Sequence, residues 1–381
     1  MNVLLFGLLL STVFILLNFY IHKRLINKLD LSKGIKRSLD IFLAINFLGV
    51  VAYILARYYV SIPSWLYYLL SLPIGVLFLL FCTAIVYDLS RVLLLNIPMS
   101  ASRRAFFKKS LDISSLIVAA GLSARAMYEA RDVEVEKVTI KIKDLARPYK
   151  IVQISDLHIG GLITKAFIHD MVQKINALHP DLVVITGDLI DVRVKYAQNT
   201  LNELKRLHST YGTYFIVGNH EYFHGIAEII NAVKSLGIRV LENESVYIGE
   251  KGRGFNLVGV YDVFGYRSKN YQPDLYKALK NIKDSPTVLL AHQPRFIEEV
   301  DGRVDLMLSG HTHGGQIYPF RFLTRLTQPY ISGLHQHTKD LQIYVSKGTG
   351  FWGPPMRLGA NSEITEIILQ PSTQAKAVLK D

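Results

Sequence analysis

Leu306-Met-Leu-Ser-Gly-His-Thr-His-Gly-Gly-Gln316 is an apolar run that ends in two histidines separated by one residue. A short apolar run that ends in glycine is typical of a buried strand that opens into a loop. Two imidazoles at the carboxyl end of such a strand can converge on a cation. The stretch therefore predicts a metal site, provided that the chain offers matching ligands elsewhere.

Composition divides the chain into two parts. The 381 residues are enough for more than one folded unit, and 50% of them are hydrophobic. Residues 1–150 hold 19 Lys and Arg against 9 Asp and Glu, whereas the remaining residues hold 24 against 22. The basic excess lies beside the most apolar segments, which indicates membrane topology rather than a nucleic-acid surface. The single cysteine, Cys82, excludes a disulfide framework and a thiolate zinc site within one chain.

The first 128 residues are predicted to be a transmembrane region. Apolar segments at 3–21, 41–60 and 66–87 are close to the roughly 20 residues that a helix needs to cross the hydrocarbon. A fourth segment, at 111–128, has a shorter apolar run that contains Asp112. Its length resembles a signal-peptide core, but its flanks match a cleavage site poorly, so we predict an uncleaved fourth span.

Charge predicts which side of the membrane each part occupies. Lysine and arginine cluster at 23–37 and at 91–109, so both loops are expected in the cytoplasm and the N-terminus outside. Ser102-Arg-Arg-Ala-Phe-Phe-Lys108 resembles the twin-arginine export signature, although it can also be read as an ordinary basic flank. We therefore expect a multi-pass protein of the cell membrane whose soluble domain is extracytoplasmic.

Residues 133–371 are predicted to form that soluble domain, followed by a tail at 372–381. Short apolar or alternating runs predict strands within 133–142, 151–158, 182–189, 214–221, 255–261, 287–290, 306–308, 341–345 and 363–369. Helical periodicity appears at 167–178, 201–207 and 226–236. The order of these elements predicts an α/β fold with a mixed sheet system.

Chemically suitable side chains follow several of these strands. They are Asp156, His158, Asp188, Asn219, His220, His292, His311 and His313. In open α/β sheets, ligands gather outside the carboxyl ends of the strands. A single aspartate in such a position is more often a turn or a cap. Five such segments in order are harder to attribute to turns, so we expect one shared site.

These segments read, in order, Asp156-Leu-His158, Gly187-Asp-Leu189, Gly218-Asn-His-Glu221, His292 and Gly310-His-Thr-His313. Over about residues 150–370 the chain resembles the calcineurin-like metallophosphoesterases, whose five motifs it matches. The resemblance implies an αββα sandwich, here preceded by an α-helical membrane domain. The stretches 310–316 and 346–357 resemble a bacterial membrane-associated branch of that superfamily.

The resemblance also implies two divalent metal ions. It assigns one metal to Asp156, His158 and His313. It assigns the other to Asn219, His292 and His311, with Asp188 as the bridge. Carboxylate, amide and imidazole donors without thiolate suit Mn, Fe or Zn equally. A hydroxide between the metals would attack phosphorus, and His220 would protonate the leaving oxygen or stabilise the phosphoryl charge.

Several residues keep two interpretations. Asp191 and Glu221 could orient ligating histidines or be solvated loop carboxylates. His224 is close enough in sequence to touch substrate, whereas the pair His335 and His337 lies outside the motif set. Arg357 could hold a phosphate oxygen or tie down its own loop. Residues 317–330 could be a packed cover loop or a lid on the membrane.

The function predicted from these patterns is metal-dependent hydrolysis of phosphodiester or phosphomonoester bonds by a membrane-anchored enzyme. Its substrate could be lipid-linked, and no nucleic-acid partner is expected. One alternative is a pyrophosphatase that cleaves a nucleotide-linked lipid, such as a UDP-diacylglucosamine-type substrate, at the cytoplasmic face. Another, from a different class, is a non-catalytic membrane scaffold or sensor, against which the intact ligand set argues.

Overall fold

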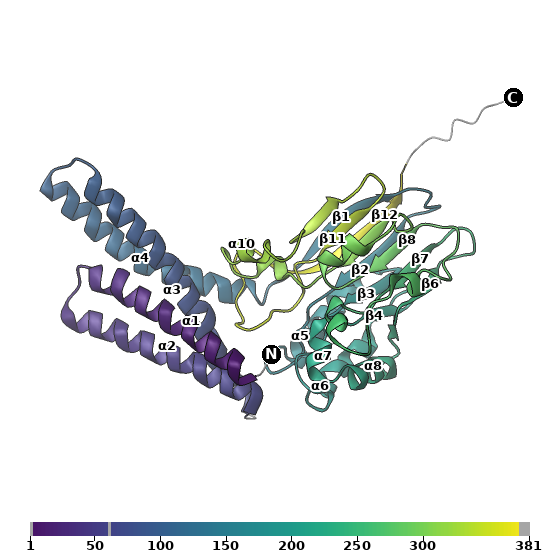
Figure 1. Ribbon diagram of the computed structural model, residues 1–381, viewed down its shortest axis with the longest axis horizontal. Coiled ribbons are helices and arrows are strands. Elements are labelled where there is room, and N and C mark those ends of the chain that lie inside the picture. The colour runs from purple at the N-terminus through teal and green to yellow at the C-terminus, as the bar shows by residue number, and fades with distance from the viewer. Residues whose placement is uncertain (1–2, 60–61, 373–381) are drawn as a thin grey trace. The chain divides into compact units, whose positions relative to one another are not determined.

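The computed structural model describes residues 3–59 and 62–372, which form two compact units (Figure 1). The first unit comprises the chain up to Glu129 together with Gly353–Leu358. The second comprises Ala130–Trp352 and the chain from Gly359 onward. Residue 60 of the predicted second span, and all of the predicted tail except residue 372, lie outside the described residues.

Long helices make up the first unit. They are α1 (Val3–Arg24), α2 (Lys33–Tyr59), α3 (Ser64–Asn96) and α4 (Ala101–Glu129), with the short 3₁₀ helix η1 (Ile26–Lys28) after α1. Within the described residues, these four helices are each long and apolar enough to cross a membrane. Each helix includes residues outside the apolar segment predicted for it, because polar residues next to the segment continue the helical hydrogen bonds. The twin-arginine-like segment therefore lies inside α4.

A hydrogen-bonded carboxylate explains why α4 can be less apolar than its neighbours. Asp112 is buried, and its oxygens accept from the Tyr87 hydroxyl at 2.7 Å, the Lys108 ammonium at 2.7 Å and the Asp30 amide at 2.6 Å. Burying a charge is costly unless it is paired and hydrogen-bonded, and these three donors meet that condition. Nearby, the Arg104 guanidinium donates to the Leu94, Leu95 and Ile97 carbonyls at the end of α3.

The second unit contains two six-stranded sheets. The first has the order β1 (Val133–Ile142), β12 (Ser362–Pro371), β2 (Tyr149–Ile154), β3 (Leu182–Thr186), β4 (Thr213–Ile216) and β5 (Arg239–Val240). The second has the order β10 (Gly333–Gln336), β11 (Gln342–Val345), β9 (Leu306–Ser309), β8 (Thr287–Leu290), β7 (Phe255–Gly259) and β6 (Glu244–Ile248). Strands β2, β3, β4 and β5 pair in parallel, as do β7, β8, β9 and β11. Parallel strands end at the same edge of their sheet, which prepares one common site.

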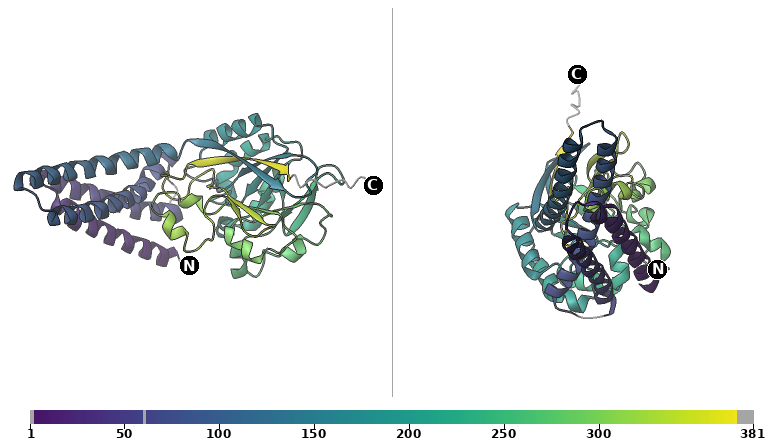
Figure 2. Two further views of the ribbon diagram at one scale, coloured as in Figure 1. Left: turned by 90° about the horizontal axis from the view of Figure 1, so that it is seen from above. Right: turned by 90° about the vertical axis from the view of Figure 1, so that its left-hand side faces the viewer.

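Apolar side chains stack the domain into four layers (Figures 1 and 2). Ile151, Leu182, Leu290 and Leu308 belong to the fully buried core between the two sheets. A second core joins the first sheet to α5 (Lys165–Ala177), α6 (Val194–Leu201) and α8 (Ile226–Ser235). A third joins the second sheet to η3 (Val263–Arg267), α9 (Leu275–Ala278) and η4 (Pro294–Glu299). The predicted αββα fold is therefore confirmed.

One predicted helix differs in position. The helix expected at 201–207 is α6, which ends at Leu201, followed by the 3₁₀ helix η2 (Asn202–Arg206). Ala197, Leu201 and Leu204 are buried at helical spacing, so the face that packs on the sheet begins four residues earlier than expected. The polar residues between them hid that start from a reading of apolar runs.

Candidate metal centre

Eight side chains of the predicted site follow the carboxyl ends of five strands. Asp156 and His158 follow β2, Asp188 follows β3, Asn219 and His220 begin α7 (Asn219–His224) after β4, His292 follows β8, and His311 and His313 follow β9. Because β2, β3 and β4 belong to one sheet and β8 and β9 to the other, neither sheet alone could assemble this set.

The backbone at this edge is held in an unusual conformation. Asp156, His158, Asp188, His311 and His313 all have positive φ, between 50° and 73°. A non-glycine residue in this left-handed region costs about 1–3 kcal/mol and persists only where surrounding structure enforces it. Here the amides of Asp156 and His158 bond to the carbonyls of Gly187 and Asp188, both at 3.0 Å. Left-handed backbone at five candidate ligands that follow three strands indicates a functional site.

Asp156, His158 and His313 form the first group of possible ligands. The Nε2 atoms of His158 and His313 lie 3.0 Å apart, and His313 Nε2 lies 3.5 Å from Asp156 Oδ1. All three residues are buried. The Asp156 carboxylate also accepts the His311 amide, which fixes the loop after β9 against the loop after β2.

Asp188, His292 and His311 form the second group. His292 Nε2 lies 3.3 Å from Asp188 Oδ2, while its Nδ1 lies 2.7 Å from the Thr186 carbonyl. Since a carbonyl accepts only from N–H, His292 Nδ1 is the protonated nitrogen and Nε2 is left to bind a ligand. Asp188 Oδ2 also lies 3.9 Å from His158 Nε2. Asp188 thus stands between the two groups.

Two buried acceptor atoms at this edge lack a hydrogen-bond partner. They are the side-chain oxygen of Asn219 and Nε2 of His292. A buried polar atom left unpaired costs about 1–3 kcal/mol, so such atoms in native proteins need an explanation. A cation bound by both atoms would supply one. The donor set of carboxylate, imidazole and amide oxygen fits a divalent transition metal.

Glu221 is buried and organises two of the loops. Its two oxygens accept four backbone amides, those of Gly218, Asp188, Leu189 and Ile190, at 2.6–3.2 Å. The carboxylate therefore holds the loop after β3 against the start of α7. Of the two interpretations open from sequence, neither is right, because Glu221 is neither solvated nor bonded to a histidine. It orients the backbone that carries Asp188 and Asn219.

Asp191 lies beside three histidines. Its carboxylate is bonded to His220 Nδ1, and it lies 3.3 Å from His158 Nδ1. His224 Nε2 is 3.9 Å from the same carboxylate. The arrangement turns Nε2 of both His158 and His220 toward Asp188, at 3.9 Å and 3.8 Å from its Oδ2. Asp191 thus orients histidines, as one of the two sequence interpretations holds.

The charged side chains of the site shift one another's pKa values strongly. Burial alone would raise the pKa of Asp188, but His292 and His220 outweigh it and hold that pKa well below its usual range. Burial opposes a charge on His292, yet the Asp188 carboxylate raises the pKa of His292 well above its ordinary value. Burial lowers the pKa of His311 to about 3, and His292 adds to this shift. The carboxylates attract positive charge, a condition that also favours a bound cation.

Buried side-chain hydrogen bonds near the site connect the two sheets. The buried Gln153 amide of β2 donates to the Thr186 hydroxyl and to the Ser309 carbonyl, both at 2.9 Å. Thr186 ends β3 and Ser309 ends β9, so one side chain links strands of both sheets. The Ser309 hydroxyl in turn donates to the Ala291 carbonyl. These bonds fix the relative position of the loops that follow.

Aromatic rings line the side of His220. The ring centroid of Trp352 lies 6.0 Å and that of Phe223 lies 5.8 Å from the His220 ring, and both aromatic side chains are exposed. Sequence reasoning missed both. Phe223 lies two residues after the Gly218–Glu221 motif, which was the available signal, but Trp352 is far away in the chain and only the fold reveals its position.

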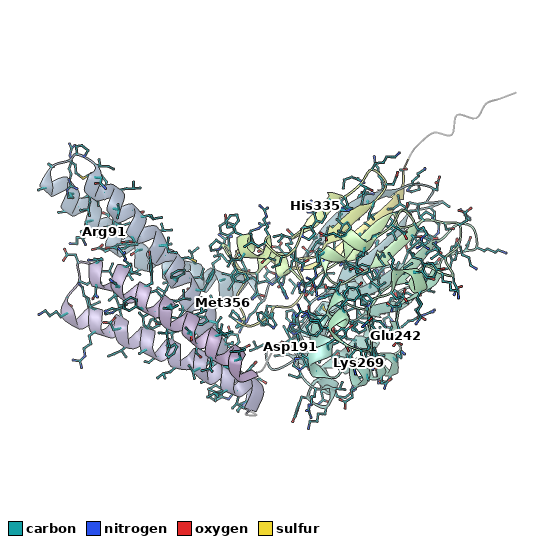
Figure 3. All side chains as sticks on the ribbon, viewed as in Figure 1. Arg91, Asp191, Glu242, Lys269, His335 and Met356 are labelled. Carbon is teal, nitrogen blue, oxygen red and sulfur yellow. The ribbon has the colours of Figure 1, made fainter. Side chains whose placement is uncertain are left out.

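Other sequence candidates lie elsewhere. Figure 3 labels His335, which lies in β10. His335 stacks on Tyr330 and has Nε2 2.9 Å from the Ser332 carbonyl, and His337 contacts the Tyr330 hydroxyl. Arg357 belongs to the helical unit, where it is fully buried and its amide donates to the Ala126 carbonyl of α4. That placement favours the structural interpretation of Arg357 over the phosphate-binding one.

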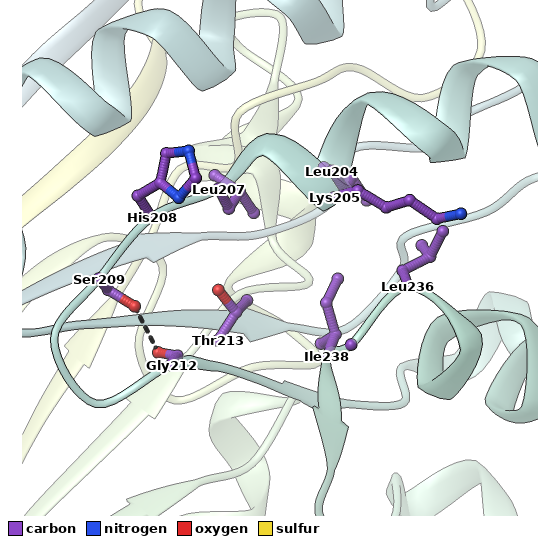
Figure 4. Close-up of a pocket in the computed structure, with 10 residues that line it drawn as sticks. Leu204, Lys205, Leu207, His208, Ser209, Gly212, Thr213, Leu236 and Ile238 are labelled. Atoms are coloured by element: carbon purple, nitrogen blue, oxygen red, sulfur yellow. Dashed lines mark hydrogen bonds between the residues drawn. The ribbon is translucent and has the colours of Figure 1, made fainter.

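A hollow lies at the amino ends of β4 and β5 in the first sheet (Figure 4). Its lining includes Leu207, His208 and Gly212 before or at the start of β4, and Leu236 and Ile238 before β5. The Ser209 hydroxyl closes its loop on the Gly212 carbonyl at 2.7 Å. Because the candidate ligands follow the carboxyl ends of the strands, this hollow at the amino ends is separate from them.

The layered fold and the histidine-rich edge define a metallohydrolase. A model of the calcineurin-like phosphoesterase family matches residues 149–315. A protein of Helicobacter pylori described as an uncharacterized metallophosphoesterase is 38% identical, over 95% of this chain and 98% of its own. A metallophosphoesterase of Campylobacter jejuni is 32% identical, over 96% and 98%. A Bos taurus transmembrane protein with a metallophosphoesterase domain is 38% identical over 58% of this chain and 53% of its own.

The chain therefore belongs to the calcineurin-like phosphoesterase family, as its five motifs predicted. It is a hydrolase that acts on phosphoric ester bonds, and its candidate ligand groups support metal dependence. The prediction of an enzyme is confirmed, which removes the non-catalytic scaffold or sensor. The long apolar helices indicate a membrane protein.

Proposed function

We propose that the protein hydrolyses phosphoesters at a centre that holds two divalent cations, while its helices anchor it in a membrane. Asp156, His158 and His313 would hold one cation, and Asn219, His292 and His311 the other, with Asp188 between them. When bound, such a pair would activate a water molecule for attack on phosphorus and offset the charge of the phosphoryl group.

One observation supports this proposal above the others. The Asn219 oxygen and His292 Nε2 are buried without hydrogen-bond partners, and His292 Nε2 lies 3.3 Å from Asp188 Oδ2. Water or protein groups normally satisfy such atoms, because leaving them unpaired is destabilising. Their presence next to two groups of imidazole and carboxylate atoms is best explained by metal ligation.

The remaining side chains have positioning and proton-holding roles. His220 Nδ1 is bonded to Asp191, so its Nε2 faces the site and could give a proton to the leaving oxygen. Glu221 keeps Asp188 and Asn219 in register through the backbone. Trp352 and Phe223 form an apolar wall beside His220, which suits an ester with an aromatic or aliphatic leaving group.

Metal reconstitution tests this function. Purified full-length protein stripped with a chelator is expected to lose hydrolysis of bis(p-nitrophenyl) phosphate and to regain it with Mn²⁺, Fe²⁺ or Zn²⁺, with about two ions bound per chain. Monoesters, diesters and lipid pyrophosphates assayed in parallel would identify the leaving group. Hydrolysis unchanged after verified removal of metal would contradict the proposal.

We further propose that residues 1–128 are the membrane region and that the domain at 133–371 lies outside the cytoplasm. Two basic clusters and the four candidate spans within the described residues support this topology, and the twin-arginine-like segment agrees with it. A reporter fused after Asp381 that requires export for activity is therefore expected to be active. The placement would be overturned by a reporter that works only in the cytoplasm.

A further inference from the structure

An exposed apolar segment follows the metal-ligand loop almost directly. Residues 316–328, which we term the α10 loop, contain the short helix α10 (Arg321–Thr324) and begin three residues after His313. Phe322 is 52% exposed, Leu323 56% and Leu326 80%. Large apolar side chains grouped on a surface mark contact with another body more often than single exposed ones do.

Side-chain hydrogen bonds hold the α10 loop at both ends, so its exposed residues belong to an ordered loop. At its start, the Gln316 side chain donates to the Trp352 carbonyl and accepts the Trp352 amide, at 2.8 Å and 3.0 Å. At its end, the buried Gln328 accepts the Arg295 amide at 3.1 Å. Successive backbone turns connect Phe320 to Gln328. Phe322, Leu323 and Leu326, which we term the apolar tip, are therefore exposed on a loop that is bonded to the domain at both ends.

Charge limits what this tip can contact. Arg321 and Arg325 alternate with Phe322, Leu323 and Leu326, and the chain from Leu306 to Lys339 contains neither aspartate nor glutamate. Apolar side chains interleaved with arginine are typical of segments that lie in the interfacial layer of a bilayer. An acidic lipid surface complements such a segment, because each nearby arginine is attracted to the phosphate groups.

The chain itself brings a bilayer within reach. Only Ala130–Asp132 separate the end of α4 from the start of β1, and three residues extend about 10 Å at most. The domain is thus tethered closely to a helix long and apolar enough to cross a membrane. Because the domain is covalently attached to such a helix, a lipid surface is always close to it, whereas a soluble partner would have to reach it by diffusion.

We propose that the α10 loop is a membrane-docking surface, whose apolar tip enters the interfacial layer while Arg321 and Arg325 bind lipid phosphates. The inference rests on the membrane placement proposed above and does not depend on the metal or on the substrate. It would hold the metal-ligand loop, which shares the backbone of the α10 loop, next to the bilayer surface.

A fluorescence experiment on the full chain tests the docking. In a Cys82→Ser background, single cysteines at Leu326, Leu69 or Tyr276 are labelled with an environment-sensitive dye and reconstituted in nanodiscs containing headgroup-nitroxide lipid. Leu69 lies exposed in α3 and reports on the span, whereas Tyr276 lies exposed in α9 and serves as the soluble control. The Leu326 label is expected to be quenched at least about twofold more than the Tyr276 label.

The outcomes separate the two proposals. Quenching at Leu69 with none at Leu326 beyond the Tyr276 level would overturn the docking surface and leave the span intact; this result is also expected if α10 meets a second protein. No quenching at Leu69 would overturn the membrane placement itself. In anionic nanodiscs, Arg321→Glu with Arg325→Glu should reduce quenching at Leu326, whereas the matched Lys269→Glu variant should not.

Discussion

Replacing Asp188 with asparagine is expected to abolish both metal loading and hydrolysis. Asp188 Oδ2 lies within 4 Å of nitrogen atoms from His158, His220 and His292, so it is the carboxylate that we propose to lie between the two cations. Changes to residues that merely orient ligands usually reduce metal affinity or activity about 10–100-fold, and loss of a shared ligand should exceed that range.

The substitution is nearly isosteric, which makes the result interpretable. Glu221 holds the Asp188 amide, so the loop should keep its course when only the side-chain charge is removed. Metal content by elemental analysis and turnover of bis(p-nitrophenyl) phosphate are the measurements. Asp274→Asn, at the exposed start of α9, is the matched control and should behave as the parent protein. Two ions per chain and parental turnover in Asp188→Asn would refute the bridging role.

His220→Ala is expected to separate metal binding from turnover. The His220 ring bonds to Asp191 through Nδ1. His220, Asp191 and His158 lie close enough to form a third possible ligand group, but His220 is not among the ligands proposed for either cation, so both cations should remain. Without the proton at Nε2, the rate should fall about 10²- to 10⁴-fold, the range that a positioned general acid usually contributes. The loss should appear in kcat rather than in KM.

The control for this variant is a histidine in the same domain that lies at the amino ends of the strands, away from the candidate ligands. His208 is exposed beside the hollow before β4, and His208→Ala should keep parental rates (Figure 4). Loss of metal in His220→Ala would reassign His220 to the ligand set. Retention of full turnover would remove it from the mechanism.

Sequence alone determined the parts of this protein that depend on local pattern. Apolar runs such as those at 182–189 and 306–308 predicted buried strands, because burial on both faces requires continuous apolar residues. The side chains that follow those runs fell at strand ends, and parallel strands end together. The candidate ligands could therefore be named from Asp156 to His313 before any strand was placed. The first three long apolar helices of the described chain followed from length and hydropathy in the same way, whereas the apolar run of the fourth was short and its prediction also rested on the poor match to a cleavage site.

Only the tertiary structure decided how distant segments meet. The strand from the end of the chain, β12, pairs between β1 and β2, and Gln153 of β2 bonds to Ser309 of β9 in the opposite sheet. Glu221 accepts backbone amides from two loops, Trp352 lies beside His220, and the Arg357 amide donates to the Ala126 carbonyl of α4. These contacts depend on sheet order and layer packing, whereas sequence periodicity reports only which face of an element is buried. Chemistry at each position could be read locally, and its assembly into one centre required the fold.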